Sequence, residues 1–376
     1  FSKFVKNFKG ERDSENTISL SLQTVSNDKY LKLYKLKSNL VDYNQDTLES
    51  SLDFTHEDGD IFFGLNTSVF ETLKDSYEDK YEYIIPEITF NKNMFASENL
   101  GNLDFQSNLK IHNYDTNKLT NFIVNNLNWS SRDFLHESGI KSKFLGSFKN
   151  INYESKNVDI YKSDPTSEIY GALGYQSEVK LKKDLGENQH FLTPKFFARY
   201  APGSMRKENS GSRLNPSRAF SMDRLENVNN FESGMTGAIG LDYQFKNNND
   251  QIFDFSIAQI INKEENKKMS SESSLDEKLS DFVGSANFNA SDKIKLNYNF
   301  ALDQNYKELN YNDMGTQMNF GALDINFNYL QEKNHIGNKD YIKTKLTYEQ
   351  DEKGMFSFET KRNLITNSSE FYNLSY

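Results

Sequence analysis

The feature that most constrains the fold of this chain is an alternation of apolar and polar residues with a period of two. Between residues 294 and 302, every second side chain is Ile, Leu, Tyr or Phe, and those between are Lys, Asn or Ala. Successive side chains of a β-strand point to opposite faces, so such a segment predicts a strand with one apolar and one polar face. Further segments of this kind lie at 18–22, 61–65, 103–111, 239–245, 253–257, 323–329 and 342–348.

Polar clusters typical of turns separate these segments. They lie at 56–60, 184–188, 246–250, 289–293 and 349–354. When the noisier segments are counted as well, the pattern predicts about sixteen to eighteen antiparallel strands that follow one another as hairpins.

The composition indicates which environment such strands occupy. No apolar run approaches the roughly 20 residues that a membrane-spanning helix requires. Disordered chains are poor in aromatic residues, whereas this chain of 376 residues is 14% aromatic. Lipid offers no hydrogen-bond partners, so amphipathic strands of about 10 residues cross a bilayer only when they pair around a closed ring. We therefore predict an all-β fold, a large antiparallel transmembrane β-barrel.

A soluble β-solenoid or a large sandwich would also contain alternating strands. Two features favour the membrane barrel over these alternatives. No repeat of fixed length is visible. Tyrosines stand at the ends of the apolar faces, as in the aromatic girdles of outer-membrane barrels, and these are Tyr243, Tyr298, Tyr329 and Tyr348.

Several functional classes are disfavoured. The net charge of -10 argues against a nucleic-acid partner, and the absence of Cys excludes thiol chemistry. No nucleophile elbow, phosphate-binding loop or dinucleotide fingerprint occurs, so we expect neither an enzyme nor a cofactor, with a protease or lipase at a barrel rim as the alternative. No metal site is expected either, because the histidines lack ligand spacing; they are His56, His112, His136, His190 and His335.

The alternation stops at about residues 201–232, where we expect a long luminal or extracellular loop. Five of the eight arginines fall within 26 residues here. Adding Lys207 and subtracting Glu208 and Asp223 leaves a net charge of +4 in this stretch. The planar guanidinium group suits bidentate pairing with phosphate or carboxylate. The candidate ligand or partner contacts are therefore Arg199, Arg206, Arg213, Arg218 and Arg224.

Two interpretations of these arginines remain open. In the first, they pair with acidic side chains that line the barrel lumen and thereby hold a folded loop inside it. In the second, they contact an anionic ligand that passes through or across the barrel. Ion-paired lumens are common in barrels and need no ligand, which favours the structural interpretation on composition alone.

The same region carries a family resemblance. The stretches 193–205 (TPKFFARYAPGSM), 212–220 (SRLNPSRAF) and 223–225 (DRL) resemble the central barrel region of the LPS-assembly protein family LptD (OstA). The stretches 28–52 and 363–372 are similar to other barrel strands of that family. Besides the arginines, the motif residues are Tyr200, Pro202, Gly203, Leu214, Asn215, Phe220, Asp223 and Leu225.

The resemblance implies a protein that releases lipopolysaccharide (LPS) into the outer leaflet of the Gram-negative outer membrane, without chemistry on the lipid. It implies three partners: LPS, an LptE-like plug lipoprotein, and a periplasmic LptA-like bridge that reaches the barrel through an N-terminal jellyroll. It also supplies an anionic ligand for the arginines, so that LPS and the plug both become candidate contacts. A passive porin or receptor barrel, or an adhesin, is the alternative.

The resemblance bears on the extent of the chain as well. The jellyroll is not among these residues, and family barrels continue beyond the position of Tyr376. We therefore expect an incomplete barrel whose closing strands and lateral gate lie outside the chain. The alternative is that Tyr376 is the terminal aromatic residue of a complete barrel.

Overall fold

The computed structural model describes residues 1–10, 14–38, 40–74, 80–115, 117–209, 211, 213–225, 227–248, 250–350 and 354–376. Motif residue Ser212, residue 249 of one predicted turn and residues 351–353 of another lie outside the described residues. The described part contains 21 strands, and neighbouring strands pair in antiparallel order, which confirms the predicted all-β fold. Among the described residues, no helix has the length and apolar character needed to cross a membrane.

The strand number exceeds the sixteen to eighteen predicted from alternation. β8 (Phe134–Leu135) and β11 (Leu181–Leu185) are too short to show a clear period of two. The turns are also tighter than the polar clusters suggested. β3 continues through the predicted turn residues 56–58, because a pair of residues, Gly59 and Asp60, suffices to reverse the chain into β4.

The chain divides into two compact units, which are described separately. Unit 1 comprises Phe1–Arg132 and Gly146–Gly171. Its elements are β1 (Ser2–Lys9), β2 (Glu15–Leu22), α1 (Tyr30–Tyr34), β3 (Thr47–Asp58), β4 (Ile61–Thr72), β5 (Tyr81–Ser97), β6 (Gly101–Tyr114), β7 (Lys118–Ser130), most of β9 (Ile140–Lys156) and the start of β10 (Thr166–Val179).

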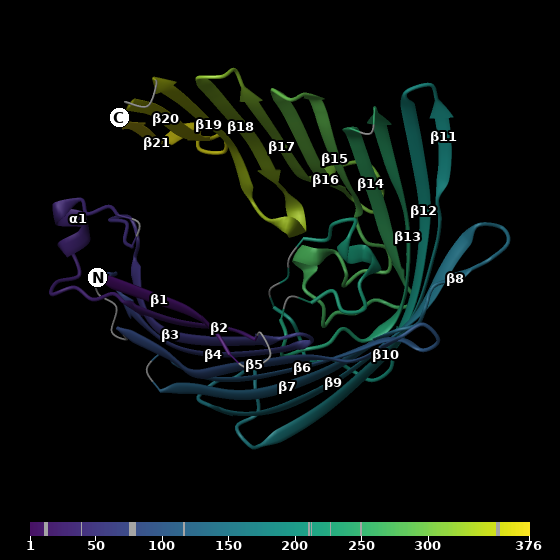
Figure 1. Cartoon of the computed structure of the whole chain (residues 1–376), viewed down its shortest axis with the longest axis horizontal. Helices are drawn as coiled ribbons and strands as arrows, with labels where there is room; N and C mark the ends of the chain where they lie inside the picture. Colours follow the sequence, from purple (N-terminus) through teal and green to yellow (C-terminus); the bar gives the residue numbers. More distant parts are fainter. Residues whose placement is uncertain are drawn as a thin grey trace. The chain divides into compact units, whose positions relative to one another are not determined.

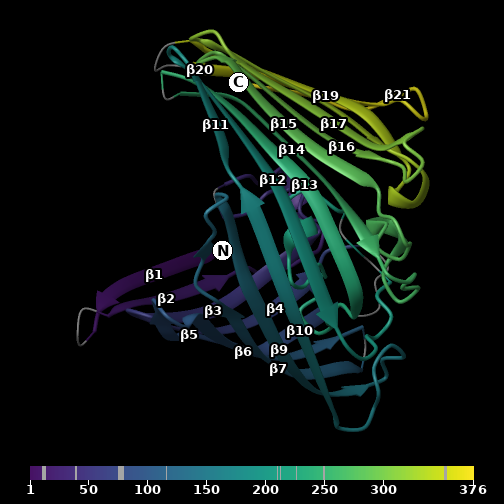
Figure 2. The ribbon, with the colours of Figure 1, turned by 90° about the vertical axis from the view of Figure 1, so that its right-hand side faces the viewer.

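Unit 2 comprises Asp133–Leu145 and Ala172–Tyr376. Its long strands lie side by side in Figure 2, where β12 to β19 form one continuous surface. After β8 and β11 its elements are β12 (Asn188–Ala201), η2 (Arg218–Phe220), β13 (Gly234–Asn247), β14 (Asp250–Asn262), η3 (Ser271–Ser273), β15 (Phe282–Ser291), β16 (Ile294–Leu302), β17 (Leu309–Asn319), β18 (Leu323–Glu332), η4 (Asn334–Ile336), β19 (Lys339–Gln350), β20 (Gly354–Asn363) and β21 (Ser368–Ser375).

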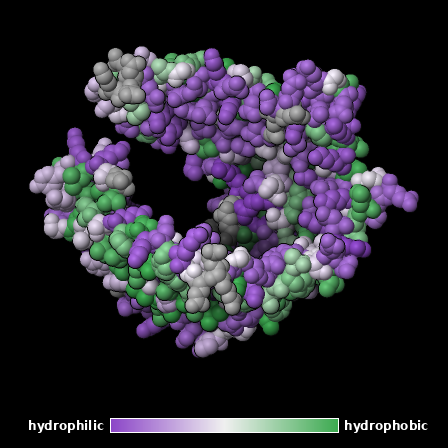
Figure 3. Space-filling view, in the orientation of Figure 1, coloured by the Kyte–Doolittle hydropathy of each residue, from purple (hydrophilic) through white to green (hydrophobic). Residues whose placement is uncertain are grey.

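The strands expose their apolar faces, which is the reverse of a soluble sheet. On β13, Met235 and Ile239 are 53% and 49% exposed, whereas Thr236 and Ala238 on the opposite face are buried. We call these the apolar face and the polar face. In unit 1, hydrophobic residues likewise gather over the strands in the lower part of Figure 3. Large apolar side chains in this arrangement are stabilised by lipid rather than by water.

Aromatic rings form a row across the apolar face of unit 2. Tyr243 and Phe255 are cross-strand partners, as are Phe253 and Phe288. The ring centroids of Phe253 lie 6.0 Å from Tyr243, 6.5 Å from Phe255 and 6.3 Å from Phe288. Such a row is typical of the aromatic girdle where a barrel meets the membrane interface.

The connections of unit 2 differ in length between the two ends of its strands. One end carries the long connections 202–233 and 263–281, together with 303–308 and 333–338. The other end carries tight turns such as 186–187, 292–293 and 320–322. The candidate site lies at the end with the long connections.

Replacing Ile239 by Lys tests the assignment of faces. At the bilayer midplane a Lys on the lipid side destabilises a barrel by roughly 2–4 kcal/mol, and by less nearer the interface. We expect this loss for Ile239→Lys in urea titrations of the protein refolded into vesicles. Gln244→Lys, on the polar face of the same strand, is the control and should have little effect; equal losses for both variants would contradict the assignment.

Candidate functional site

The candidate site is built on the connection between β12 and β13, residues 202–233, which we call the arginine-rich segment. It folds back over the polar face of unit 2 beside β13 and β14 (Figure 1). The connection 263–281 interlocks with it. The backbone N–H of Glu208 donates to the carbonyl of Lys268 at 2.8 Å, and the Asn266 amide donates to the carbonyl of Ser233 at 3.2 Å.

An apolar core fixes the segment to the strands. Met205, Leu214 and Ala219 of the segment are buried together with strand residues. On β13 the neighbouring Gly240 leaves room for Phe220, since a Cβ there would lie 2.7 Å from the phenylalanine ring. The strand residues of this core are Phe197, Ala238, Ala258, Ile260, Val283 and Ala301. Hydrophobic burial thus places the arginines between the segment and the wall.

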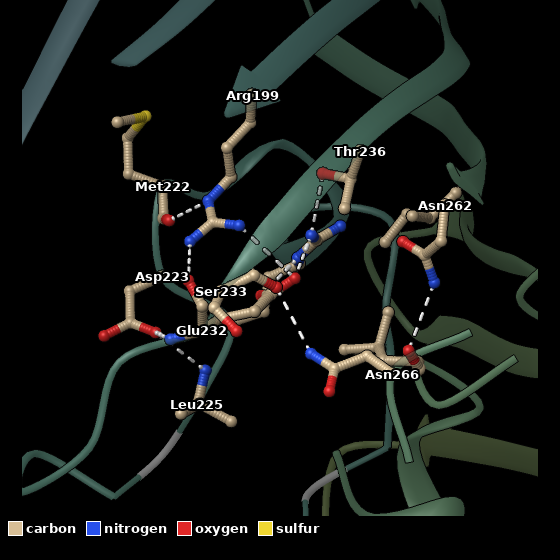
Figure 4. A network of polar contacts seen from close by, with 12 residues as sticks. Arg199, Met222, Asp223, Leu225, Glu232, Ser233, Thr236, Asn262 and Asn266 are labelled. Carbon is tan, nitrogen blue, oxygen red and sulfur yellow. Dashed lines mark hydrogen bonds and ion pairs between the residues drawn. The ribbon is translucent and has the colours of Figure 1, made fainter. Parts of the chain in front are cut away.

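Two of the five arginines, Arg199 and Arg224, share one buried carboxylate, that of Glu232. Figure 4 shows Arg199 beside Glu232. Arg224 donates two hydrogen bonds to this carboxylate, one of them from Nε to Oε2 at 2.7 Å. It also donates to the Thr236 hydroxyl at 2.9 Å. Arg199 lies 3.6 Å from the same carboxylate and donates to the backbone carbonyls of Met222 and Glu232. All three charged side chains are almost completely buried.

This triad depends on all its members. Burial alone would raise the pKa of Glu232, but the charges of Arg224 and Arg199 hold that pKa below its ordinary value. The carboxylate is therefore ionised, and two cations compensate it. Removing one partner from a buried ion pair is strongly destabilising, because the remaining charge stays desolvated.

Two further arginines bind the backbone of the segment itself. The Arg206 guanidinium donates to the carbonyl of Asn229. The Arg218 guanidinium donates to the carbonyl of Arg224 at 2.7 Å, and the Arg218 backbone N–H donates to the Asn215 side chain at 2.9 Å. These contacts close the segment on itself.

Arg213 is arranged differently from the other four. Its side chain is 38% exposed and pairs with Glu332 of β18 at 2.5 Å. The guanidinium lies 4.0 Å from the centre of the Tyr311 ring. Glu332 also meets the Lys339 ammonium at 3.3 Å. Arg213 therefore reaches across to the strands while part of its guanidinium stays accessible.

A cavity of about 740 Å³ lies beside this pair. Its lining includes three cationic side chains, Arg213, Arg218 and Lys339, and two carboxylates, those of Glu272 and Glu332. Asn215, Asn299, Asn338 and the rings of Phe300 and Tyr311 complete its wall. Amides, guanidinium groups and aromatic rings together suit a polar, anionic sugar or a phosphate better than an apolar ligand.

The family-motif residues have structural positions around this site. Tyr200 is 54% exposed on the apolar face, whereas Leu214, Phe220 and Leu225 belong to the core or pack against it. Asp223 accepts from the backbone N–H groups of Glu232 and Leu225 at 3.3 and 3.4 Å. Pro202 and Gly203, with φ of +92° at the glycine, turn the chain out of β12.

The sequence did not single out the acidic and aromatic partners of the arginines. Glu232 follows the last arginine of the run by eight positions, and Glu332 lies on a strand far along the chain. Tyr311 and Lys339 are equally remote in sequence. The excess of arginine was the only available signal, and it indicated buried acids in general without identifying them.

A second, smaller cavity of about 240 Å³ lies nearby and is lined by Asp276, Asp281, Asp303 and His335 among others. His335 Nε2 lies 3.0 Å from the buried Asp281 carboxylate. The nearby Asp281 carboxylate raises the pKa of His335, burial opposes the rise, and the charges of Asp276 and Glu277 reinforce it. Within the described ranges, no group of three or more acidic or histidine side chains has an arrangement that could hold a metal ion.

Strands with exposed apolar faces, an aromatic row and a folded connection against the polar face define the class of protein, an outer-membrane β-barrel protein. A family model described as LptD, LPS transport system D, matches residues 4–352. The chain belongs to the LptD family, which confirms the resemblance, and its role lies in LPS transport at the outer membrane. No match was found among the curated proteins.

Glu232→Gln tests the buried triad. The neutral side chain leaves Arg224 and Arg199 without a compensating charge, so we expect a loss of about 3–5 kcal/mol in the stability of the folded segment. Limited proteolysis should then cut within 202–233 in the refolded protein. Glu264→Gln, in the connection 263–281, is the control; cleavage at the wild-type rate in Glu232→Gln would show that the triad does not hold the segment.

The pair of His335 with Asp281 makes this end of unit 2 sensitive to pH. Because the folded-state pKa of His335 is raised, the pair stabilises the fold fully below the ordinary pKa of about 6.5 and loses that contribution as pH rises through the raised value. Hydrogen exchange in 333–338, corrected for its intrinsic pH dependence, should be slower at pH 6 than at pH 9. A pH dependence that persists in His335→Gln would refute this origin.

Proposed function

We propose that this protein inserts LPS into the outer leaflet of the outer membrane, and that the arginine-rich segment contacts the saccharide part of the lipid or a plug protein. The observation that carries the proposal is the cavity beside Arg213. There, Arg213, Arg218 and Lys339 meet polar amides and aromatic rings between the folded connection and the strands. LPS carries phosphates and acidic sugars, which are the groups that such a set binds.

The five arginines divide between two roles in this proposal. Arg199, Arg206 and Arg224 fold the segment, because they bind Glu232 or backbone carbonyls. Arg213 and Arg218 line the cavity and carry the contact with the ligand, and Arg218 also donates to the carbonyl of Arg224. The structural interpretation therefore applies to Arg199, Arg206 and Arg224, the functional one to Arg213, and both apply to Arg218.

The length of the connections supports an outward position of the segment. Outer-membrane barrels have short periplasmic turns and long extracellular connections. By that rule, the end of unit 2 with the connections 202–233 and 263–281 is the extracellular end. LPS that enters from the periplasm reaches this end last, which suits a contact made just before release.

The partners follow from the same role. A lipid with a large polar head requires a protected route into the barrel, which we assign to an LptA-like periplasmic bridge. An LptE-like lipoprotein would fill polar lumen that the chain's own connections leave uncovered. The polar face of β17 and β18, which pairs Asn328 with Asp313 at 2.9 Å, is a surface of the kind that such a plug contacts.

The double variant Arg213→Gln/Arg218→Gln tests the proposal in the full-length protein assembled with its partners. We expect a loss of LPS delivery or of plug binding, because Gln keeps hydrogen bonding but removes both charges from the cavity. Folding is checked by heat-modifiable migration. Arg362→Gln on β20 is the matched control.

Wild-type LPS delivery together with wild-type plug binding in the double variant would overturn the role of these two arginines. Diffusion of small solutes in liposomes by the isolated protein, with no requirement for partners, would instead indicate a passive porin.

A further inference from the structure

The connection between β2 and β3 in unit 1 carries a feature that LPS transport does not explain. It contains α1 and is fixed to the sheet through Leu31, which is buried together with Val41, Leu48 and Leu73. Leu48 lies on the same face of β3 as Leu52, which is 46% exposed. The connection is therefore attached to the apolar face, where lipid is expected, and not to the polar face.

Beside the buried Leu31, α1 carries an apolar surface that is uncovered. Tyr30, Leu33 and Tyr34 occupy positions i, i+3 and i+4, so they share one side of the helix. Leu33 is 71% exposed and Tyr34 is 67% exposed. The two tyrosine rings contact each other, with centroids 4.9 Å apart. A preformed apolar surface of this kind on an otherwise charged connection indicates a partner with apolar character.

Lysines surround this surface. Lys29 precedes α1 and Lys35 follows it in the left-handed conformation that ends the helix. Lys32 and Lys37 are tied back to the connection, at 2.9 Å from Asp46 and 3.4 Å from Asp42. Tyrosine beside lysine is the composition of protein surfaces at the headgroup level of membranes, where rings lie at the boundary and ammonium groups reach phosphates.

We propose that α1 with Lys35 is an interfacial anchor that binds anionic, phosphate-bearing lipids of the membrane in which the strands lie. Tyr30, Leu33 and Tyr34 enter the boundary between headgroups and acyl chains, and the Lys35 ammonium contacts lipid phosphates. Two observations select this occupant. The surface continues the apolar face of β3, and its charge complements an anionic leaflet.

The absence of cysteine from the chain allows a direct test with single-cysteine spin labels. Leu33→Cys is compared with Asn44→Cys, an exposed polar position on the same connection. Both proteins are refolded into vesicles of phosphatidylcholine, with or without phosphatidic acid. We expect the label at position 33 to be accessible to oxygen and protected from a water-soluble nickel chelate, and the label at position 44 to show the opposite.

Lys35 is tested in the same system. Adding phosphatidic acid should deepen the label at position 33, and Lys35→Gln should weaken that response, since each lysine near an anionic surface contributes about fivefold in affinity. Equal access of the nickel chelate to positions 33 and 44 would overturn the anchor. Protection of position 33 from both reagents would also overturn it, because it would indicate a protein neighbour. Neither outcome bears on LPS delivery, so the anchor and the proposed function fail independently.

Discussion

Backbone hydrogen bonding in lipid is the constraint on which the rest of this structure depends. A strand in a bilayer must pair along both edges, because no water is present to satisfy its N–H and C=O groups. Antiparallel pairing therefore runs continuously from β12 to β21 within unit 2. The backbone of the wall is committed to this task, which leaves the connections as the parts that can vary. The candidate binding features accordingly all involve connections: the arginine triad, the cavity beside Arg213 and α1.

The arginine-rich segment shows how a connection becomes rigid without regular secondary structure. Few of its backbone groups hydrogen-bond to other backbone groups, so side chains must supply the hydrogen-bond partners. Arginine does so with several donors in a fixed plane. Glu232 compensates Arg224 and Arg199 at a point where water is excluded. Replacing arginine by lysine would keep the charge but lose the second donor to the carboxylate. The segment can therefore present Arg213 at a defined position, because Arg206 and Arg224 hold the segment in its fold.

The wall was predictable from sequence because its period of two reports directly on the environment of each face. The apolar sets around Ile239 and Tyr298 fall on β13 and β16 as expected. Short strands such as β8 escaped detection, since two residues define no period. The composition of the sequence identified the arginines, but it did not distinguish those that fold the segment from those that line the cavity. That distinction depends on the distant Glu332 and on Gly240, whose missing side chain admits Phe220.

The location of buried charge also explains why the cavity beside Arg213 and the cavity beside His335 differ in the sign of their net charge. Near Arg213, cationic side chains outnumber the carboxylates of Glu272 and Glu332, which favours an anionic ligand. Around His335 the acids predominate, and the histidine becomes the group that compensates them. Two neighbouring spaces of opposite sign, both held by connections at the same end of the strands, create a field across that end. A lipid with a phosphorylated head would be drawn toward the first space and repelled from the second, so the connections would orient it as well as bind it.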